Sequence, residues 1–595
     1  MAKDLTDEIV QDETDESTDN QVDSTEEVQN SESIDADAQE DEVSDDVEVD
    51  ESTDEEQDDK KKTLDKPSKE PKNFKEKIKE LFEKWWNNKK LRYSTFAGIG
   101  VLIVLSILIP VSRYFILNTF GVRAKTSITV YDESSKFPLK NVQVSISGKT
   151  VKTDQKGLAK LENIKLGKQK LTISKRAFAE VSKNVTIGWG SNPLGKTDIK
   201  PVGAQYTFYL TDWLSGKPVS LGQATSGDYD AGADKDGKIL LTIEPSDDED
   251  LDVNISSNGY RTEKIKLDLS NKAKIDVKLV SKRKHPFISR RSGTYDLYKI
   301  DVDGKNENLV LKGSGLENSS MNILSHPTDE VTSVTSTREE VRNSDGYLLN
   351  SLYIVDLEDN SSERIAQAEA IKTYGWSNDK LIYTLTVAGT SAANPKRNRL
   401  FSYDYKTKSK KELASANNFN DILLIGSNVY YAPGNSYVGN GSSNFSRINA
   451  DGSNQVNILN KEVWNIFRSS YDDFDLSVAN QEWYNYKTSD DKAFISSSPP
   501  TNFVNKDFID NPSFKKSLWT EDRDGQGTLI LYDIPKKDDK VLKQQAGLKY
   551  AVRWLDDTKL VYRIQTSNET ADYVLNIDGG DAVKIRDVTQ STPVY

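Results

Sequence analysis

The chain has 595 residues, of which 29% are charged and 35% hydrophobic, with a formal net charge of −15, no cysteine and two histidines. Without cysteine the chain has neither disulfides nor thiolate metal sites, and two histidines leave little material for His-based catalysis or a His-ligated metal. Residues 1–59 hold 27 Asp or Glu and one Lys, residues 60–92 hold 13 Lys or Arg and five acids, and the remainder is nearly neutral. A neutral main part disfavours nucleic-acid binding, and a large cysteine-free chain fits a bacterial envelope better than a eukaryotic secreted protein.

Residues 1–65 are rich in Asp, Glu, Ser, Thr and Gln, contain no aromatic residue, and are predicted to form a disordered acidic tail. The next segment, 66–92, is predicted to be a basic amphipathic helix that lies on anionic lipid with its Trp pair at headgroup depth. Its apolar residues recur at helical spacing: Phe74, Ile78, Leu81, Phe82, Trp85 and Trp86.

A membrane span is predicted over residues 93–117, because the run from Ser94 to Ser112 is uncharged and long enough to cross a hydrocarbon core. A buried core helix or a cleaved signal peptide fits less well, since more than ninety residues precede the run. Basic residues concentrate before it, which places the N-terminus in the cytoplasm and everything after the span outside. The expected membrane-interface residues are Trp85, Trp86, Lys89, Lys90, Arg92, Tyr93, Arg113 and Tyr114.

A tandem repeat follows, with one unit over residues 126–200 and another over 201–281. Asp132 and Asp212 are 80 residues apart, and so are Gly157 and Gly237, which indicates duplicated units. Short alternating runs split by Gly, Pro, Asn and Asp predict a small antiparallel β-sandwich in each. The Asp234-Lys-Asp-Gly237 string is interpreted as a turn, because its spacing does not match an EF-hand calcium loop.

The order strand, Asp, x-Pro-Val, Thr-Asp-x-x-Gly and Gly-Tyr resembles the carboxypeptidase regulatory-like and PEGA group of surface modules. The second unit, with Lys217-Pro-Val219 and Gly259-Tyr260, matches better than the first, which has Arg176-Ala-Phe178 in place of Gly-Tyr. The resemblance implies spacers or weak adhesion units, without catalysis.

Residues 285–595 repeat an aromatic strand followed by Asp and a turn, as in Leu297-Tyr-Lys-Ile-Asp301 and Leu352-Tyr-Ile-Val-Asp356. The intervals are mostly 43 to 55 residues, with one gap of 84 from Phe445 to Leu529 that could hide a further repeat or an insertion. This period predicts a β-propeller, with six blades favoured and seven as the alternative. A second element, exemplified by Trp376-Ser-Asn-Asp379, together with the Tyr-x-x-Asp strand, resembles the TolB-like propeller family.

Three expected connections between second and third strands are long: 337–349, 387–399 and 433–444. Such loops would gather on one face, which we take as the candidate binding face. The candidate residues are Arg338, Arg342, Arg397, Arg399 and Tyr437. Ordinary growth of surface loops would explain their length equally well.

The chain contains no G-x-S-x-G, P-loop or H-E-x-x-H motif; His285 and His326 each precede Pro and are expected in turns. No catalytic residue, cofactor or metal is therefore predicted. The expectation is a mostly β, single-pass envelope protein whose propeller binds an envelope protein or a cell-wall glycan without turnover. Two alternatives are a propeller glycosidase or lyase with paired carboxylates, and coupling of ligand binding to the acidic tail.

Overall fold

The computed structural model describes residues 74–246, 248–434, 443–500 and 505–587. The predictions made for the acidic tail, for residues 66–73 and for Tyr437 lie outside these ranges.

Three helices, not one, occupy the predicted span and its flanks. The helices are α1 (Phe74–Asn87), α2 (Lys89–Leu108) and α3 (Pro110–Thr119). The expectation of one continuous helix over 93–117 is wrong, because Pro110 has no N–H to donate and its ring disfavours a helical residue before it. Ile109 accordingly has extended dihedrals, φ −80° and ψ 117°. Among the described residues no single helix is long and apolar enough to cross a bilayer; Lys89–Leu105 and Pro110–Thr119 meet these criteria only as a pair bent by 96°.

Helix α3 packs on the first β module. The Asn118 side-chain amide donates to the Leu166 carbonyl at 3.0 Å, and its oxygen accepts from the Leu166 N–H at 2.9 Å. Tyr114 and Leu117 pack against the module core. Tyr114, which the sequence predicts at a membrane interface, therefore contacts protein here.

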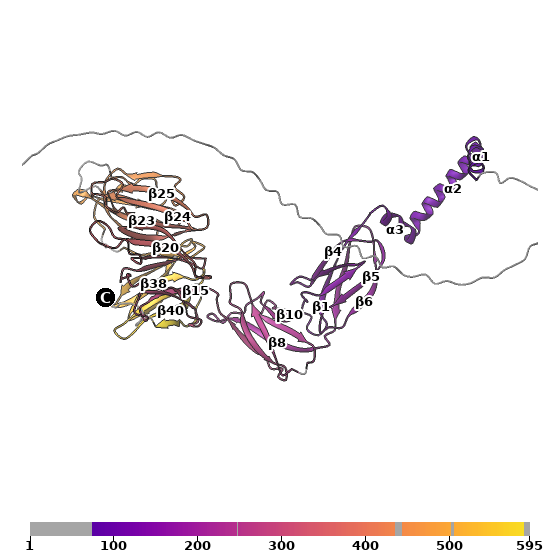
Figure 1. The fold of residues 1–595 in the computed structure, drawn as a ribbon, viewed down its shortest axis with the longest axis horizontal. Coiled ribbons are helices and arrows are strands. Elements are labelled where there is room, and N and C mark those ends of the chain that lie inside the picture. Colours follow the sequence, from indigo (N-terminus) through magenta and orange to yellow (C-terminus); the bar gives the residue numbers. More distant parts are fainter. Residues whose placement is uncertain (1–73, 247, 435–442, 501–504, 588–595) are drawn as a thin grey trace, which may run out of the picture. The chain divides into compact units, whose positions relative to one another are not determined.

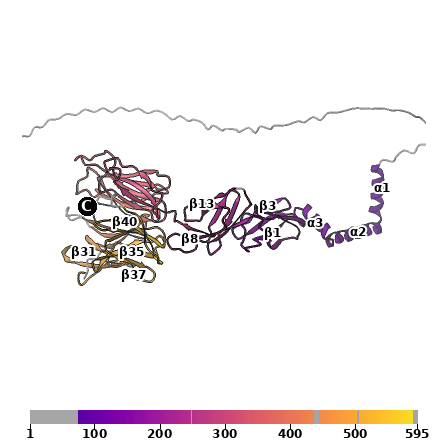
Figure 2. The same cartoon turned by 90° about the horizontal axis from the view of Figure 1, so that it is seen from below.

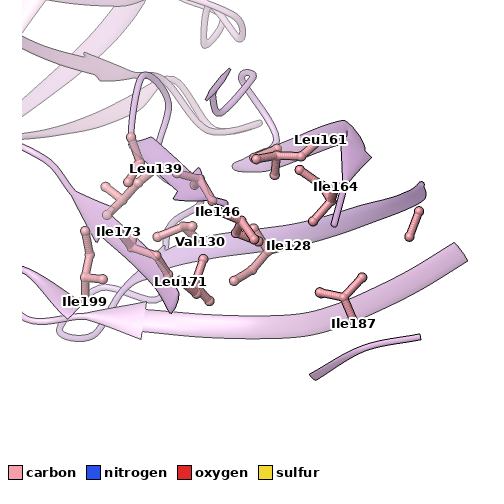
Figure 3. Close-up of a cluster of buried hydrophobic side chains, with 14 of the residues drawn as sticks. Ile128, Val130, Leu139, Ile146, Leu161, Ile164, Leu171, Ile173, Ile187 and Ile199 are labelled. Carbon is pink, nitrogen blue, oxygen red and sulfur yellow. The ribbon is translucent and has the colours of Figure 1, made fainter. Parts of the chain in front are cut away.

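Each repeat unit folds into two sheets around one core. Module 1 (residues 124–199) pairs sheet β4-β1-β7 with sheet β3-β2-β5-β6, and module 2 (residues 204–279) pairs β11-β8-β14 with β10-β9-β12-β13. Figure 3 shows side chains from both sheets of module 1, among them Ile128 and Leu171, meeting in one core. The strands are β1 (Ala124–Asp132), β2 (Gln143–Ile146), β3 (Lys149–Lys152), β4 (Leu158–Ile164), β5 (Gly167–Ser174), β6 (Val181–Ile187), β7 (Ser191–Ile199), β8 (Ala204–Asp212), β9 (Gln223–Ser226), β10 (Tyr229–Gly232), β11 (Lys238–Ile243), β12 (Asp250–Ser256), β13 (Glu263–Asp268) and β14 (Ile275–Leu279).

The sheets are not wholly antiparallel as expected. β1 pairs in parallel with β7, and β8 pairs in parallel with β14. In each module the last strand returns beside the first after a long connection, which permits parallel pairing. The alternation of apolar and polar residues along a strand shows which face is buried, but it does not show which strand is the pairing partner.

The duplication extends to individual backbone hydrogen bonds. Val130 N–H donates to the Gly157 carbonyl at 2.8 Å, and 80 residues later Leu210 N–H donates to Gly237 at 2.8 Å. Asp234 Oδ1 accepts from the backbone N–H groups of Asp236 and Lys238, so the predicted turn at this string is confirmed.

The described residues between 284 and 587 form seven successive sheets of consecutive antiparallel strands. The strands of the first three sheets are β15 (Lys284–Ser289), β16 (Asp296–Asp301), β17 (Asn308–Leu311); β18 (Asn322–Ser325), β19 (Val331–Ser336), β20 (Asn350–Asp356), β21 (Ser362–Ala368); β22 (Ala370–Ser377), β23 (Lys380–Thr386), β24 (Asn398–Asp404) and β25 (Ser409–Ala416). Those of the next two are β26 (Asn418–Ile425), β27 (Asn428–Gly434), β28 (Phe445–Asn449), β29 (Val456–Leu459); β30 (Val463–Phe467), β31 (Asp473–Val478), β32 (Trp483–Lys487) and β33 (Phe494–Ile495), with a short 3₁₀ helix, η1 (Ala479–Gln481). The last two hold β34 (Ile509–Asp510), β35 (Lys516–Arg523), β36 (Gln526–Asp533), β37 (Asp538–Gln545); β38 (Leu548–Trp554), β39 (Lys559–Gln565), β40 (Thr570–Asn576) and β41 (Val583–Asp587).

The first strands of neighbouring sheets contact one another, as β22 does β26, β26 does β30, and β34 does β38. Sheets that meet through their first strands surround a common axis, which is the architecture of a β-propeller. Figure 2 shows strands β31, β35 and β37, which belong to two successive sheets of this region.

The count of seven sheets exceeds the six blades that the sequence favours. The 84-residue interval contains a complete sheet, β30 to β33. Its third strand, Trp483–Lys487, is not followed by Asp, so the repeat pattern skips it.

The first sheet differs from the others because it has three strands. Its β16 carries Tyr298 and Asp301, which the other sheets carry on their third strand, so β15 corresponds to a second strand and the first-strand position is empty. The first and last sheets share a core that includes Phe287, Val561 and Val574. In Figure 1 β15 accordingly lies beside β38 and β40.

Candidate functional site

A cavity of about 570 Å³ lies where the first strands of the propeller sheets turn into the second strands. Its walls come from β15, β18, β22, β34 and β38 and from the turns that follow β18, β22 and β34, with Leu424 and Gly426 from the fourth sheet. Cavities of roughly 300–1,000 Å³ hold most small-molecule ligands. The empty first-strand position beside β15 explains why His285 and Pro286 reach the cavity wall.

The cavity and the predicted binding face lie at opposite ends of the blades. In an antiparallel meander the connection from strand one to strand two is at one end, and the connection from two to three is at the other. The long connections that follow β19, β23 and β27 each join a second strand to a third strand, as predicted. The cavity is therefore a separate site from that face.

The arginines of the predicted face bind mostly their own surroundings. Arg342 Nη1 donates to the Gly346 carbonyl of its own loop at 2.8 Å, and Arg338 Nη2 donates to the Lys312 carbonyl at 3.1 Å. Arg397 bonds the Thr390 carbonyl, and Arg399 pairs with Glu412. These bonds stabilise the loops and their flanking strands.

The Trp residues of the repeated element connect neighbouring sheets. Trp376 Nε1 donates to the Leu324 carbonyl of the preceding sheet at 3.0 Å, and Trp554 Nε1 donates to the Ile509 carbonyl at 2.8 Å. His326 Nε2 lies 2.9 Å from the Asn378 carbonyl of the next sheet. Each ring is almost fully buried, so its ring nitrogen satisfies a carbonyl that water would not reach.

Asn511 has the corresponding role in the sixth sheet, although the sequence patterns did not single it out. Its side-chain amide donates to Asp557 Oδ1 of the seventh sheet at 3.0 Å. The signal was present, because Asn511-Pro512-Ser513 parallels His326-Pro327-Thr328 in position after a first strand.

His326, Asp329 and Asp379 offer ligand atoms within 4.8 Å of one another, which is close enough to consider a metal. His326 does not fit that role: Nδ1 accepts from the Asp329 N–H at 2.9 Å while Nε2 faces the Asn378 carbonyl. Burial lowers the pKa of His326, which keeps it neutral. Lys406 Nζ lies 3.0 Å from Asp329 and 2.9 Å from Asp379, so the two carboxylates already share a cation.

A second cluster of charged side chains lies at the inner edge of β15. Lys284 N–H donates to Glu330 Oε2 at 2.9 Å, and Arg553 Nη1 donates to the Lys284 carbonyl at 3.3 Å. Arg283 lies 3.0 Å from Glu330 Oε1 and donates to the His326 carbonyl at 3.1 Å. Buried side chains thus satisfy the backbone groups that a first strand would have paired.

His285 is in strand β15 and not in a turn, so that expectation is wrong, whereas His326 does begin a turn. His285 Nε2 lies 2.9 Å from Asp572 Oδ2 of the last sheet, and Asp572 also accepts two bonds from Arg563 at 2.7 and 2.9 Å. Burial opposes ionisation of Asp572, but the bonds from Arg563 and His285 hold its pKa well below the usual range.

Asp510 also lines the cavity and accepts a hydrogen bond from the Tyr471 hydroxyl at 3.0 Å. Burial raises the pKa of Asp510 although Arg468 opposes this shift. The Arg468 guanidinium lies over the Phe508 ring, 4.4 Å from its centroid, and Phe508 also lines the cavity.

No family model and no curated protein matches this chain, so the predicted resemblance to PEGA modules stays a prediction. Among solved structures it is similar to the propeller domain of the Trilobed protease from Pyrococcus furiosus, at 10% identity and TM-score 0.33, covering 58% of this chain and 96% of that one. It is also similar to TolB from Acinetobacter baumannii, at 12% identity and TM-score 0.26, covering 50% and 80%. A third is an oligogalacturonate lyase in complex with manganese, at 14% identity and TM-score 0.27, covering 52% and 76%.

Proposed function

We propose that this protein is a single-pass, membrane-anchored binding protein of the bacterial cell envelope. Its acidic tail lies in the cytoplasm, the basic helix α1 lies on anionic lipid, and the β domains lie outside. Modules 1 and 2 act as PEGA-like spacers for a seven-bladed, TolB-like propeller that recognises an envelope protein or a cell-wall glycan.

The observation that carries the binding role is the central cavity. It has the size of a ligand site, and aromatic side chains from different sheets, including Tyr374, Trp376 and Phe508, form part of its wall. Aromatic walls with a few fixed polar groups are typical of small-molecule sites. Among the described residues the cavity holds no serine or threonine hydrogen-bonded to His285 or His326 other than Thr328, which lies in the His326 turn.

A glycosidase or lyase remains the second candidate, because Asp510 has the raised pKa that a general acid needs. The closely spaced pair Asp329 and Asp379 supports it less. Lys406 bridges these carboxylates, and despite burial the pKa of Asp329 is lowered to about 2 by Tyr405, Lys406 and Thr328. Hydrolysis of cell-wall glycans by the full chain that is lost in Asp510→Asn would favour this second function.

The topology is tested by single-cysteine labelling, since the natural chain has no cysteine. We expect a membrane-impermeant maleimide to label Trp189→Cys in intact cells, because Trp189 is 77% exposed on module 1. Ser24→Cys in the acidic tail should be labelled only after lysis. Labelling of Ser24→Cys in intact cells would contradict the proposed orientation.

The binding role is tested by retention of cell-wall glycans and solubilised envelope proteins on the immobilised full chain. A Tyr374→Ala, Phe508→Ala variant should lose the retained partner, whereas Arg338→Ala, Arg342→Ala should keep it. The reverse result would move recognition to the long-loop face, and no retention by the natural chain would contradict a binding function. Coupling to the tail would be excluded if deletion of residues 1–59 left every phenotype unchanged.

A further inference from the structure

Arg553 is a buried cation without a carboxylate partner. It is 7% exposed and lies in the wall of the central cavity. Its bonds are long and go to backbone: Nη1 to the Lys284 carbonyl and Nε to the Trp554 carbonyl, both at 3.3 Å. Within the part of the chain that the structure describes, no Asp or Glu lies within ion-pair distance of its guanidinium.

Glu330, the carboxylate whose charge acts on Arg553, is already engaged elsewhere. Glu330 uses one oxygen for Arg283 at 3.0 Å and the other for the Lys284 N–H at 2.9 Å. Burial, together with the positive charge of Arg283, lowers the pKa of Arg553 to about 9, because both disfavour the charged form of the guanidinium. A buried guanidinium in this position is stabilised by an anion that enters from the cavity.

The carboxylates that line the cavity have partners other than Arg553. Asp379 shares Lys406 with Asp329, and Asp510 accepts a hydrogen bond from the Tyr471 hydroxyl at 3.0 Å. The single positive charge of Arg553 suits a single negative charge better than a dianion.

Aromatic side chains form part of the wall of the same cavity. Tyr374, Trp376 and Phe508 line the same cavity, which at about 570 Å³ holds a small organic molecule. The planar guanidinium offers two parallel N–H donors to a carboxylate, a geometry that few other anions match as well.

We propose that the central cavity binds a small organic monoanion, with a carboxylate of the ligand against Arg553 and its apolar ring or chain against Tyr374, Trp376 and Phe508. The inference rests on the proposed role of this cavity as a ligand site, and it adds the chemical class of the ligand.

The test compares two probes of equal shape, 4-fluorobenzoate and neutral 4-fluorobenzamide, with the full chain in detergent. Fluorine relaxation reports binding even when it is weak, and protein-free micelles provide the blank. We expect fluorobenzoate to bind at least about tenfold more tightly than the amide, because a charge-assisted hydrogen bond is lost in the amide. Unlabelled benzoate should displace it, and inorganic phosphate should not.

Variants of the protein show where fluorobenzoate binds. Arg553→Met should abolish preferential binding of fluorobenzoate, whereas Arg342→Met, an arginine of the loop after β19, should leave it unchanged. Because Arg553 also donates a hydrogen bond to the Lys284 carbonyl, its replacement removes a structural contact as well as the charge. A second variant, Phe508→Leu, therefore keeps the charge and should weaken the binding of both probes to the same degree.

Three results would overturn the proposal: equal affinity for the two probes, displacement by phosphate in preference to benzoate, or unchanged fluorobenzoate binding in folded Arg553→Met. Equal affinity would still leave the cavity as a ligand site, because the capture experiment with Tyr374→Ala, Phe508→Ala decides that question independently.

Discussion

At the scale of single residues, Asp329 shows how the turn after β18 is fixed. Its carboxylate accepts a hydrogen bond from the Tyr405 hydroxyl and pairs with Lys406 at 3.0 Å. Burial would raise the pKa of Asp329, yet these partners lower it to about 2. Because the folded pKa lies below the ordinary value near 3.9, Asp329 stabilises the fold above about pH 4, and this contribution is lost as the pH falls towards 2.

We therefore predict a pH-dependent effect of Tyr405→Phe. The variant should have a lower Tm than the natural chain at pH 7, and the difference should shrink between pH 4 and pH 2 as Asp329 becomes protonated in both proteins. Thermal unfolding at pH 7, 4, 3 and 2 measures it. Tyr347→Phe is the control, since Tyr347 is 72% exposed; a Tm difference for Tyr405→Phe that did not change with pH would contradict the assignment.

At the scale of elements, the duplicated turn predicts paired effects in the two modules. Gly157 has φ +71° and Gly237 φ +75°, and a Cβ at either position would lie 2.5 Å from the carbonyl oxygen of Val130 or Leu210. Alanine at either position should open the adjacent strand, β1 or β8, in hydrogen-exchange mass spectrometry. The loss in stability should exceed the roughly 1–2 kcal/mol that a left-handed conformation alone costs.

Gly148 and Gly216 are the matched controls, because they have φ +74° and +67°, and a Cβ at either position would have no atom within 4 Å. Alanine at these positions has the free-energy cost of the left-handed backbone conformation without a steric clash. If Gly157→Ala and Gly148→Ala increased hydrogen exchange equally, the close approach of Gly157 to Val130 would not contribute to stability.

The elements that sequence patterns predicted are those fixed by local chemistry. The turn at Asp234 depends on residues close together in the chain, and the repeat of 80 residues and the Trp elements are recognised from short motifs. The parallel pairing of β1 with β7 and the sheet β30–β33 were missed, because pairing partners leave no local pattern and β32 lacks the repeated Asp. The break at Pro110 has a local cause, because proline has no backbone N–H to donate.

The candidate site was less predictable than the elements around it. The sequence element that begins at Trp376 marks the repeat, and both Trp376 and the corresponding Trp554 line the cavity. Arg553 gave no signal, because a charged residue beside an aromatic in a strand is ordinary surface composition. What makes it unusual is the empty first-strand position of the first sheet, which depends on residues more than 260 positions away.

At the scale of the whole propeller, side chains rather than a shared strand join the first sheet to the last within the described residues. Each sheet is built from consecutive strands, and the junction contains the core around Phe287 and the polar contact of His285 with Asp572. Most of the burial at this junction is apolar, but Asp572 also neutralises Arg563, which is largely buried. The junction should therefore be sensitive to a single carboxylate.

We predict that Asp572→Ala destabilises the propeller by about 3–5 kcal/mol, because it leaves the Arg563 charge buried and unpaired. Urea unfolding followed by tryptophan fluorescence measures this change, since five of the nine tryptophans lie in the propeller. Asp236→Ala, at a side chain 70% exposed on module 2, should change stability by less than about 0.5 kcal/mol. The double variant Asp572→Leu, Arg563→Met removes both charges together and should recover part of the loss, because the penalty arises from the unpaired charge and not from a missing contact. If the double variant were less stable than Asp572→Ala, hydrogen bonding by Arg563 to other groups, such as the Tyr550 hydroxyl at 3.1 Å, would be the larger contribution to ring closure.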